Sequence, residues 1–127
     1  MAGAVLDASA VLALLRSEAG AEPIAELLAE SLVCVVNEAE VIGVLVQRGS
    51  PPAEALEIVS GLPYRLVDLD RRLARRAGTL WLAGKPHGLS LGDRCCLALA
   101  ERERLPVYTA DRSWARLALD LDVRLVR

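Results

Sequence analysis

The sequence contains few aromatic residues, with two Trp, two Tyr and no Phe among its 127 residues. RNA-binding proteins that stack bases on aromatic side chains need more of them, so this class of protein is disfavoured. Leu, Val and Ala must fill the core instead, because 54% of the residues are hydrophobic. Such a composition indicates a folded globular chain and argues against a disordered one.

Cysteine and histidine are also scarce. Of the three cysteines, Cys95 and Cys96 are adjacent, which disfavours a disulfide between them and fits a reducing compartment. His87 is the only histidine, so the chain lacks the second histidine of a typical zinc motif or a two-histidine mechanism. We interpret His87 as a structural or surface residue of a loop.

Long hydrophobic runs and a positively charged leader are missing as well. The longest apolar stretches, such as residues 41–46, are far shorter than the roughly 18 residues of a membrane-spanning helix. Asp7 interrupts what would be the apolar segment of a signal peptide. We therefore expect a cytoplasmic protein that does not associate with a membrane.

The chain has no overall positive charge, and its net charge of -2 argues against nucleic-acid binding by bulk charge. Residues 1–60 carry two basic and nine acidic groups, whereas residues 61–127 carry thirteen basic and eight acidic groups. Acidic groups gathered at a metal site and flanked by arginines would suit a phosphate-bearing substrate. An ordinary solvated surface is the simpler interpretation and the one that the pattern favours.

Short apolar segments alternate with helical patterns along the chain. Strands are predicted at residues 4–6, 32–36, 64–69, 106–109 and 123–126. Helices are predicted at residues 8–16, 21–30, 37–48 with Asn37 as the N-cap, 52–60, 71–83, 91–104 and 111–119, with a loop at 84–88. This order predicts one α/β domain over residues 1–127, with a mainly parallel sheet and a ligand site beyond the carboxyl ends of its strands.

Four acidic residues fall where they can meet at this edge of the sheet. Asp7 and Asp111 follow predicted strands, Asp93 lies near a helix start, and Glu40 lies early in the helix after the second strand. Convergent carboxylates repel one another unless they are protonated or bind a hard cation such as Mg²⁺ or Mn²⁺.

Helix capping is the alternative for the same residues. Asp7, Asp93 and Asp111 each stand near a helix start, and Asn37 with Glu40 has capping-box spacing. Caps are commoner than metal ligands. Helical periodicity also places Glu38, rather than Glu40, on the more apolar helix face, so the pattern leaves the choice of glutamate open.

Four short segments carry a family likeness: VLDASA at residues 5–10, NEAEV at 37–41, LSLGDR at 89–94 and VYTADRSW at 107–114. Together they resemble the PIN domain, especially the toxins of VapC-type toxin-antitoxin pairs. The resemblance spans nearly the whole chain and implies a PIN-like three-layer α/β/α ribonuclease. It also implies that Mg²⁺ or Mn²⁺ is held by the catalytic acids Asp7, Glu40, Asp93 and Asp111, and so selects Glu40.

The resemblance extends to two hydroxyls. Ser9 and Thr109 match family positions that hydrogen-bond to a carboxylate or to metal-bound water. Local turn or cap bonding is the alternative role for both. Some PIN nucleases carry a further acid shortly after the position of Asp111, but Arg112, Ser113 and Trp114 follow here. This departure leaves open whether one metal ion is bound or two.

Arginine supplies fourteen of the fifteen basic residues. Arg94 and Arg112 each follow a candidate ligand directly and are our candidates for contacts to substrate phosphate, with salt bridges to neighbouring acids as the alternative. The run Arg71, Arg72, Arg75 and Arg76 is more typical of a solvated or dimer-flanking helix face than of an RNA track. We interpret Trp114 as a packing residue.

Together with the acidic constellation, the family resemblance implies a metal-dependent endoribonuclease that hydrolyses RNA phosphodiesters with a metal-activated water. The family resemblance adds a homodimer and a cognate antitoxin protein. Six apolar residues are candidates for contacts with a partner, although core packing is the more common role for each of them. They are Ile24, Leu27, Leu28, Val41, Val44 and Leu45. The alternatives are a non-catalytic PIN-like interaction module and a receiver-type signalling domain. The second is disfavoured because no aspartate lies between Asp7 and Asp68.

Overall fold

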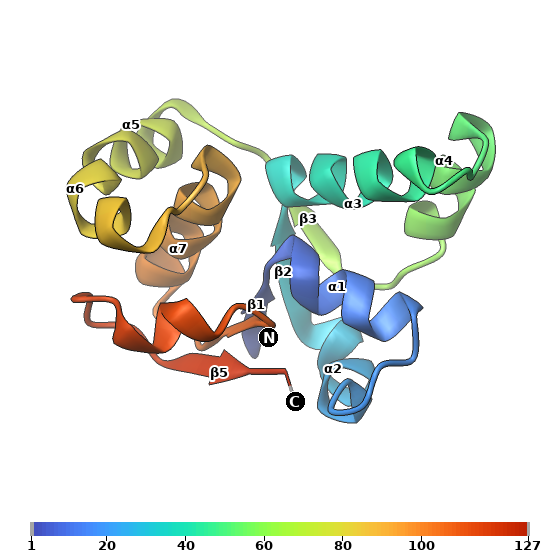
Figure 1. The fold of residues 1–127 in the computed structure, drawn as a ribbon, viewed down its shortest axis with the longest axis horizontal. Coiled ribbons are helices and arrows are strands. Elements are labelled where there is room, and N and C mark those ends of the chain that lie inside the picture. Colours follow the sequence, from blue (N-terminus) through green and yellow to red (C-terminus); the bar gives the residue numbers. More distant parts are fainter. Residues whose placement is uncertain (1, 127) are drawn as a thin grey trace.

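A parallel sheet runs through the middle of the structure, a computed structural model that describes residues 2–126 (Figure 1). Its strands lie in the order β3-β2-β1-β4-β5, and every neighbouring pair is parallel. Their bounds are β1 (Ala4–Leu6), β2 (Ser31–Cys34), β3 (Arg65–Val67), β4 (Val107–Thr109) and β5 (Val123–Leu125). The predicted parallel sheet is therefore confirmed. Met1 and Arg127, which belong to the predicted domain, lie outside the described residues.

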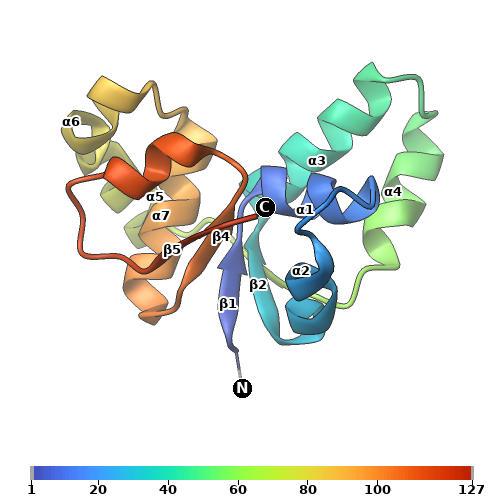
Figure 2. The ribbon, with the colours of Figure 1, turned by 60° about the horizontal axis from the view of Figure 1, so that its bottom comes forward.

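Helices cover both faces of the sheet (Figure 2). One layer contains α1 (Ala8–Leu15), α2 (Glu22–Leu27), η1 (Leu28–Glu30), α3 (Val35–Gln47) and α4 (Pro52–Ser60). The other contains α5 (Arg71–Thr79), α6 (Trp81–Gly84), η2 (Lys85–His87), α7 (Leu91–Glu103) and η3 (Arg112–Arg116). Neighbouring strand residues point to opposite faces, so Val5 packs in the core beneath α7 and Leu6 in the core beneath α1. The predicted three-layer α/β/α architecture is confirmed.

The order of the strands also decides between two fold families. Receiver domains have the order 2-1-3-4-5, whereas this sheet has the order 3-2-1-4-5. The receiver-type alternative is therefore wrong. After β3 the chain crosses to the far side of β1 and forms β4 there, so the switch point lies between β1 and β4. Ligands of open α/β sheets bind at such a point, outside the carboxyl ends of the strands.

Several predicted helices differ in their bounds. The helix assigned to residues 71–83 is interrupted after Thr79, whose hydroxyl bonds back to the carbonyl of Arg76. The segment 84–88 contains the turn η2, and the helix assigned to 111–119 is the short 3₁₀ helix η3. Trp114 of η3 is 1% exposed, which confirms its packing role. No helix within residues 2–126 has the length and apolarity needed to cross a lipid bilayer.

The start of α3 shows a larger error. The predicted N-cap, Asn37, lies inside the helix, because β2 passes directly into α3 and Cys34 occupies the cap position without a side-chain hydrogen bond. Asn37 is 1% exposed and its side chain contacts α7 instead. The prediction that Asn37 caps the helix is therefore wrong.

Candidate active site

The carboxyl ends of β1, β2 and β4, which are neighbours in the sheet, lead into segments that carry three of the acids. Asp7 follows β1 directly, Asp111 follows β4 by two residues, and Glu40 lies in α3, which continues from β2. The fourth acid, Asp93, lies in the first turn of α7, a helix that packs against α3 and β1. All four predicted acids thus belong to the same edge of the sheet.

The buried thiol of Cys96 lies in α7 close enough to three of these acids for their charges to act on it. Burial is the main reason why its pKa is well above the ordinary value, and the charges of Asp7, Asp93 and Glu40 each raise it further. Three of the four carboxylates therefore act on one point in α7. A thiol with a raised pKa in this position is an inert part of the core.

Asp7 is the buried member of the set, with 4% of its surface exposed. It is the N-cap of α1, and its Oδ1 accepts hydrogen bonds from the Ala10 amide at 2.8 Å and the Ser9 hydroxyl at 2.7 Å. Its Oδ2 accepts one from the Thr109 hydroxyl at 2.6 Å. Burial raises the pKa of Asp7 to about 6, although these hydrogen bonds oppose the rise.

Ser9 and Thr109 connect Asp7 to the segment that carries Asp111. The Ser9 hydroxyl accepts a hydrogen bond from the Ala110 amide at 2.8 Å, and the Thr109 hydroxyl accepts one from the Asp111 amide at 3.0 Å. Each hydroxyl therefore donates to the Asp7 carboxylate and accepts from the backbone after β4. Both hydroxyls make the predicted contact to a carboxylate, and Thr109 also makes a local turn bond, whereas the backbone bond of Ser9 is long-range. Contact with metal-bound water stays a prediction.

The side chain of Glu40, a residue of α3, lies against the start of α7. The Asn37 amide nitrogen donates to Glu40 Oε1 at 2.9 Å and to the Gly92 carbonyl at 3.1 Å. A Cβ added to Gly92 would lie 2.6 Å from Glu40 Cδ, so only glycine leaves room for this carboxylate. The neighbouring Glu38 is engaged elsewhere, since its carboxylate accepts a hydrogen bond from the Tyr64 hydroxyl at 2.6 Å.

Asn37 and Gly92 are site residues that sequence reasoning missed. Asn37 was assigned to a helix cap, and Gly92 was given no role. Both lie inside the segments that carry the family resemblance, NEAEV and LSLGDR, which was the available signal. Asn37 also has a buried Oδ1 without a hydrogen-bond partner in the described structure, so the site holds one unsatisfied acceptor.

Asp93 and Asp111 are oriented by helix starts. Asp93 Oδ2 accepts from the Ser90 amide at 2.9 Å in a capping box, and Asp111 Oδ1 accepts from the Ser113 amide at 2.9 Å and its hydroxyl at 2.8 Å. The capping interpretation is confirmed for both residues, as it is for Asp7. In each case the caps use one carboxylate oxygen, and the other oxygen of Asp93 and of Asp111 makes no hydrogen bond within residues 2–126.

None of the four acids forms an ion pair with a basic side chain of the described residues. Arg94 donates instead to the Ala77 carbonyl at 2.9 Å, and its buried Nε has no partner in that part of the chain. Arg112 is exposed. The salt-bridge alternative is therefore wrong for Arg94 and Arg112, while their contact with substrate phosphate stays a prediction.

The acids share an edge but do not form a closed metal cage. Within residues 2–126, no group of three or more His, Cys, Asp or Glu side chains is placed to hold a metal ion. The chemistry of the donors still suits a hard cation, because carboxylate oxygens remain free and their charge has no cationic partner.

Solved structures of several toxin-antitoxin proteins share this fold. DNA-bound VapBC from Salmonella typhimurium matches with a TM-score of 0.77 and 16% identity over 100% of both chains. VapC20 from Mycobacterium tuberculosis, a Sarcin-Ricin loop cleaving toxin, matches with a TM-score of 0.74 and 16% identity over 90% of this chain and 94% of that chain. VapBC-5 from the same organism matches with a TM-score of 0.64 and 25% identity over 100% and 99%.

Sequence comparison gives the family assignment. No curated protein sequence matches the chain significantly. The family model described as the PIN domain matches residues 4–119, a range that includes all four acids and both hydroxyls. The chain therefore belongs to the PIN domain family.

Proposed function

We propose that this protein is a metal-dependent endoribonuclease, the toxin of a VapBC-type toxin-antitoxin pair. The observation that carries the proposal is the buried Asp7 carboxylate, which is held by two hydroxyls at the sheet edge of Glu40, Asp93 and Asp111 and has no cationic partner in the described residues. PIN-domain membership supports it. The fold shared with a Sarcin-Ricin loop cleaving toxin supports it further.

In this proposal Asp7, Glu40, Asp93 and Asp111 hold Mg²⁺ or Mn²⁺. When bound there, such an ion would lower the pKa of an attacking water and offset negative charge on the phosphodiester. Ser9 and Thr109 keep the Asp7 carboxylate in one orientation. Asn37 does the same for Glu40. Arg112 is exposed beside Asp111, where its guanidinium can hold a substrate phosphate, and Arg94 is the second candidate for this contact.

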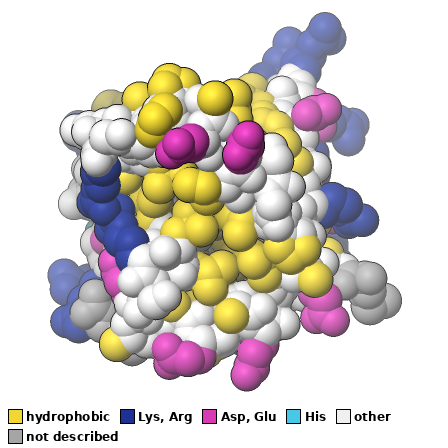
Figure 3. All heavy atoms as spheres, turned by 90° about the vertical axis from the view of Figure 1, so that its right-hand side faces the viewer, with side chains coloured by type: hydrophobic (Ala, Val, Ile, Leu, Met, Phe, Trp, Pro, Cys, Tyr) yellow, Lys and Arg dark blue, Asp and Glu magenta, His cyan; other side chains and the backbone are white. Residues whose placement is uncertain are grey.

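The proposed partner surface is the face formed by α1, α2, α3 and α4, over which hydrophobic side chains gather (Figure 3). Three of the residues predicted for partner contacts, Ile24, Leu28 and Val41, are buried in the core and are not available to a partner. Partly or more fully exposed hydrophobic residues on these helices include Leu14, Leu15, Leu45, Val46 and Leu56. An antitoxin segment with an apolar face would cover this surface. A homodimer is also proposed, and sedimentation equilibrium of the purified chain tests it.

An RNA cleavage assay tests the proposed reaction. The purified chain is incubated with structured and single-stranded RNAs in Mg²⁺, Mn²⁺ or EDTA, beside Asp7→Asn and the surface control Glu57→Gln. We expect cleavage only with metal, a loss of at least about 10³-fold in Asp7→Asn, and normal activity in the control. Equal cleavage in EDTA, or by Asp7→Asn, would contradict the proposal.

One observation favours a second candidate, a non-catalytic PIN-like interaction module. The described acids do not form a ready-made metal cluster. Calorimetric titration with Mg²⁺ and Mn²⁺ distinguishes the two functions, because the enzyme binds metal with heat that Asp7→Asn reduces. Absence of both metal binding and cleavage supports the interaction module.

A further inference from the structure

A basic groove lies between α5 and the C-terminal part of α7, at the opposite end of α7 from Asp93. Four arginines line it together with one carboxylate: Arg72, Arg76, Arg102, Arg104 and Glu101. Its apolar lining consists of Leu73 and Ala98, which are almost fully buried. The groove therefore combines a positive rim with an apolar base.

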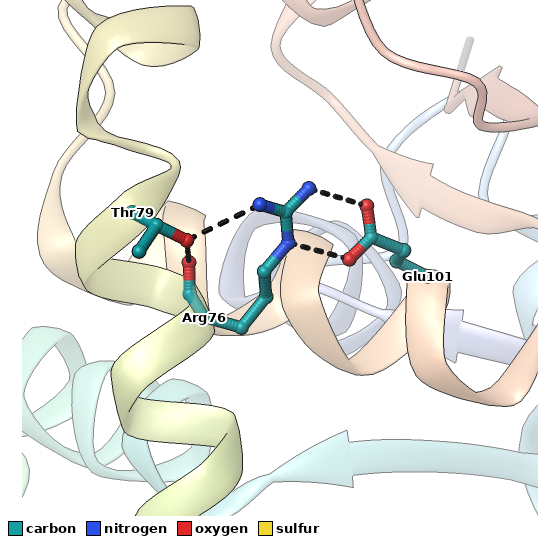
Figure 4. Close-up of polar contacts among 3 residues, drawn as sticks. All are labelled: Arg76, Thr79 and Glu101. Carbon is teal, nitrogen blue, oxygen red and sulfur yellow. Dashed lines mark hydrogen bonds and ion pairs between the residues drawn. The ribbon is translucent and has the colours of Figure 1, made fainter.

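Part of this rim is fixed by ion pairs. Arg76 binds both oxygens of Glu101, with its Nε at 2.6 Å and Nη2 at 2.8 Å, and its Nη1 donates to the Thr79 hydroxyl at 3.2 Å (Figure 4). Arg102 donates to Asp70 at 3.0 Å and to Glu103 at 3.1 Å. The contacts of Arg76 with Glu101 and of Arg102 with Asp70 link α5 and its N-cap to α7, whereas the Arg102–Glu103 contact lies within α7.

The remaining arginines are not neutralised. The side chains of Arg71, Arg72, Arg75 and Arg104 are exposed and make no hydrogen bond or ion pair with residues 2–126. Four arginines line the groove, and two of them, Arg76 and Arg102, are paired with carboxylates. The charges of Arg72 and Arg104 have no acidic partner in the described structure, and an anionic group such as a phosphate is the ligand that they suit.

We propose that this groove binds the phosphodiester backbone of RNA, at a distance from the bond that is cut; this inference rests on the proposed function. Asp93 and Glu103, the residue before Arg104, are ten residues apart in α7, which at 1.5 Å per residue is about 15 Å. A strand of a few nucleotides spans this distance. A guanidinium group can donate two hydrogen bonds to the oxygens of one phosphate. We therefore expect Arg72 and Arg104 to contact the RNA backbone.

The test measures RNA binding without cleavage. Fluorescence anisotropy with a labelled RNA hairpin is recorded in EDTA over a series of KCl concentrations. The groove variant is Arg72→Gln with Arg104→Gln, and the matched control is Arg48→Gln with Arg65→Gln, which removes the same charge from exposed positions elsewhere. We expect the groove variant to bind on the order of tenfold more weakly, with a salt slope smaller by about 1.4 to 1.8, whereas the control keeps the wild-type slope.

Three results overturn the groove proposal: equal RNA affinity of the groove and control variants, no RNA binding by the wild type, or a change of sedimenting mass in the groove variant with RNA affinity unchanged. The last result would identify a protein interface. Cleavage with Mg²⁺ is measured in parallel, so the two proposals fail separately. If the wild type binds RNA but does not cleave it, and the groove variant loses RNA binding, the groove proposal is supported and the nuclease proposal is contradicted.

Discussion

The two ends of α7 differ in whether their acidic side chains have basic partners. At its N-terminal end, Asp93 joins an edge of carboxylates that are oriented by amides and hydroxyls and have no basic partner in the described structure. At its C-terminal end, Glu101 and Arg102 are paired with side chains of opposite charge. Unpaired carboxylates are typical of ligand sites, whereas at the other end the paired Glu101 and Arg102 lie beside two arginines of the groove, Arg72 and Arg104, that have no acidic partner in the described structure.

The energetic difference follows from burial. The exposed pair Arg76–Glu101 retains 44% and 38% of its side-chain surface, so water screens most of its attraction. Asp7 is 4% exposed, and its ionisation is opposed by burial, which raises its pKa to about 6. The acidic edge therefore costs stability, whereas the paired end adds little of it.

The largest expected effect is on stability and comes from Asp7→Asn in EDTA. The pKa of Asp7 in the folded protein is about 6, above the ordinary 3.8. The contribution of protonated Asp7 to the free energy of unfolding is therefore complete below pH 3.8 and is lost as the pH rises through about 6. At 1.36 kcal/mol per pKa unit, ionisation costs about 3 kcal/mol at neutral pH, which the neutral variant avoids. Urea denaturation at about pH 4 and pH 7.5 should show a variant advantage that grows with pH. An advantage that is constant with pH contradicts this account.

Thr109→Val tests the hydroxyl that orients Asp7. The change leaves Asp7 Oδ2 and the Asp111 amide without their partner, at a cost of about 1 to 3 kcal/mol in unfolding free energy. RNA cleavage should fall about 10- to 100-fold. Thr109→Ser is the control, since it keeps the hydroxyl and should restore most of the activity. Full activity in Thr109→Val would show that the hydrogen bond has no functional role.

Gly92→Ala separates site geometry from stability. The new Cβ displaces the Glu40 carboxylate, so we expect cleavage to fall about tenfold, with little loss of stability because the displaced group ends a flexible side chain. The matched control is Gly43→Ala in α3, where nothing lies within 4 Å of the added Cβ. The control should gain up to about 1 kcal/mol and keep its activity. Equal activity of the two variants would contradict the close approach of Glu40 and Gly92.

The smallest expected effect is at the paired end of α7. Glu101→Gln removes the ion pair with Arg76 but keeps the shape of the side chain. We expect the unfolding free energy to change by less than about 1 kcal/mol, and less at high salt, because both side chains are partly exposed. Thermal denaturation at low and high KCl measures this change. A loss of several kcal/mol would remove the contrast between the two ends of α7.

Local sequence patterns predicted the features that depend on neighbouring residues. Asp7 and Asp111 were expected to cap helices, and each accepts a hydrogen bond from an amide two or three residues further along the chain. The prediction that Asn37 caps a helix was wrong, because its amide group instead donates to the carbonyl of Gly92, 55 residues away. The predicted single helix over residues 71–83 also differs from the structure, in which α5 ends at Thr79 and α6 begins at Trp81.

The sequence by itself determined the alternation of strands and helices and the acids that follow the strands, because hydrophobic periodicity and capping act within a few residues. The family resemblance selected Glu40 over Glu38, but only the tertiary structure shows which contacts separate the two glutamates. Periodicity favoured Glu38, yet Tyr64 binds Glu38, while Asn37 and Gly92 hold Glu40 beside α7. That choice depends on packing between α3 and segments 26 and 55 residues away, and no local pattern contains those contacts.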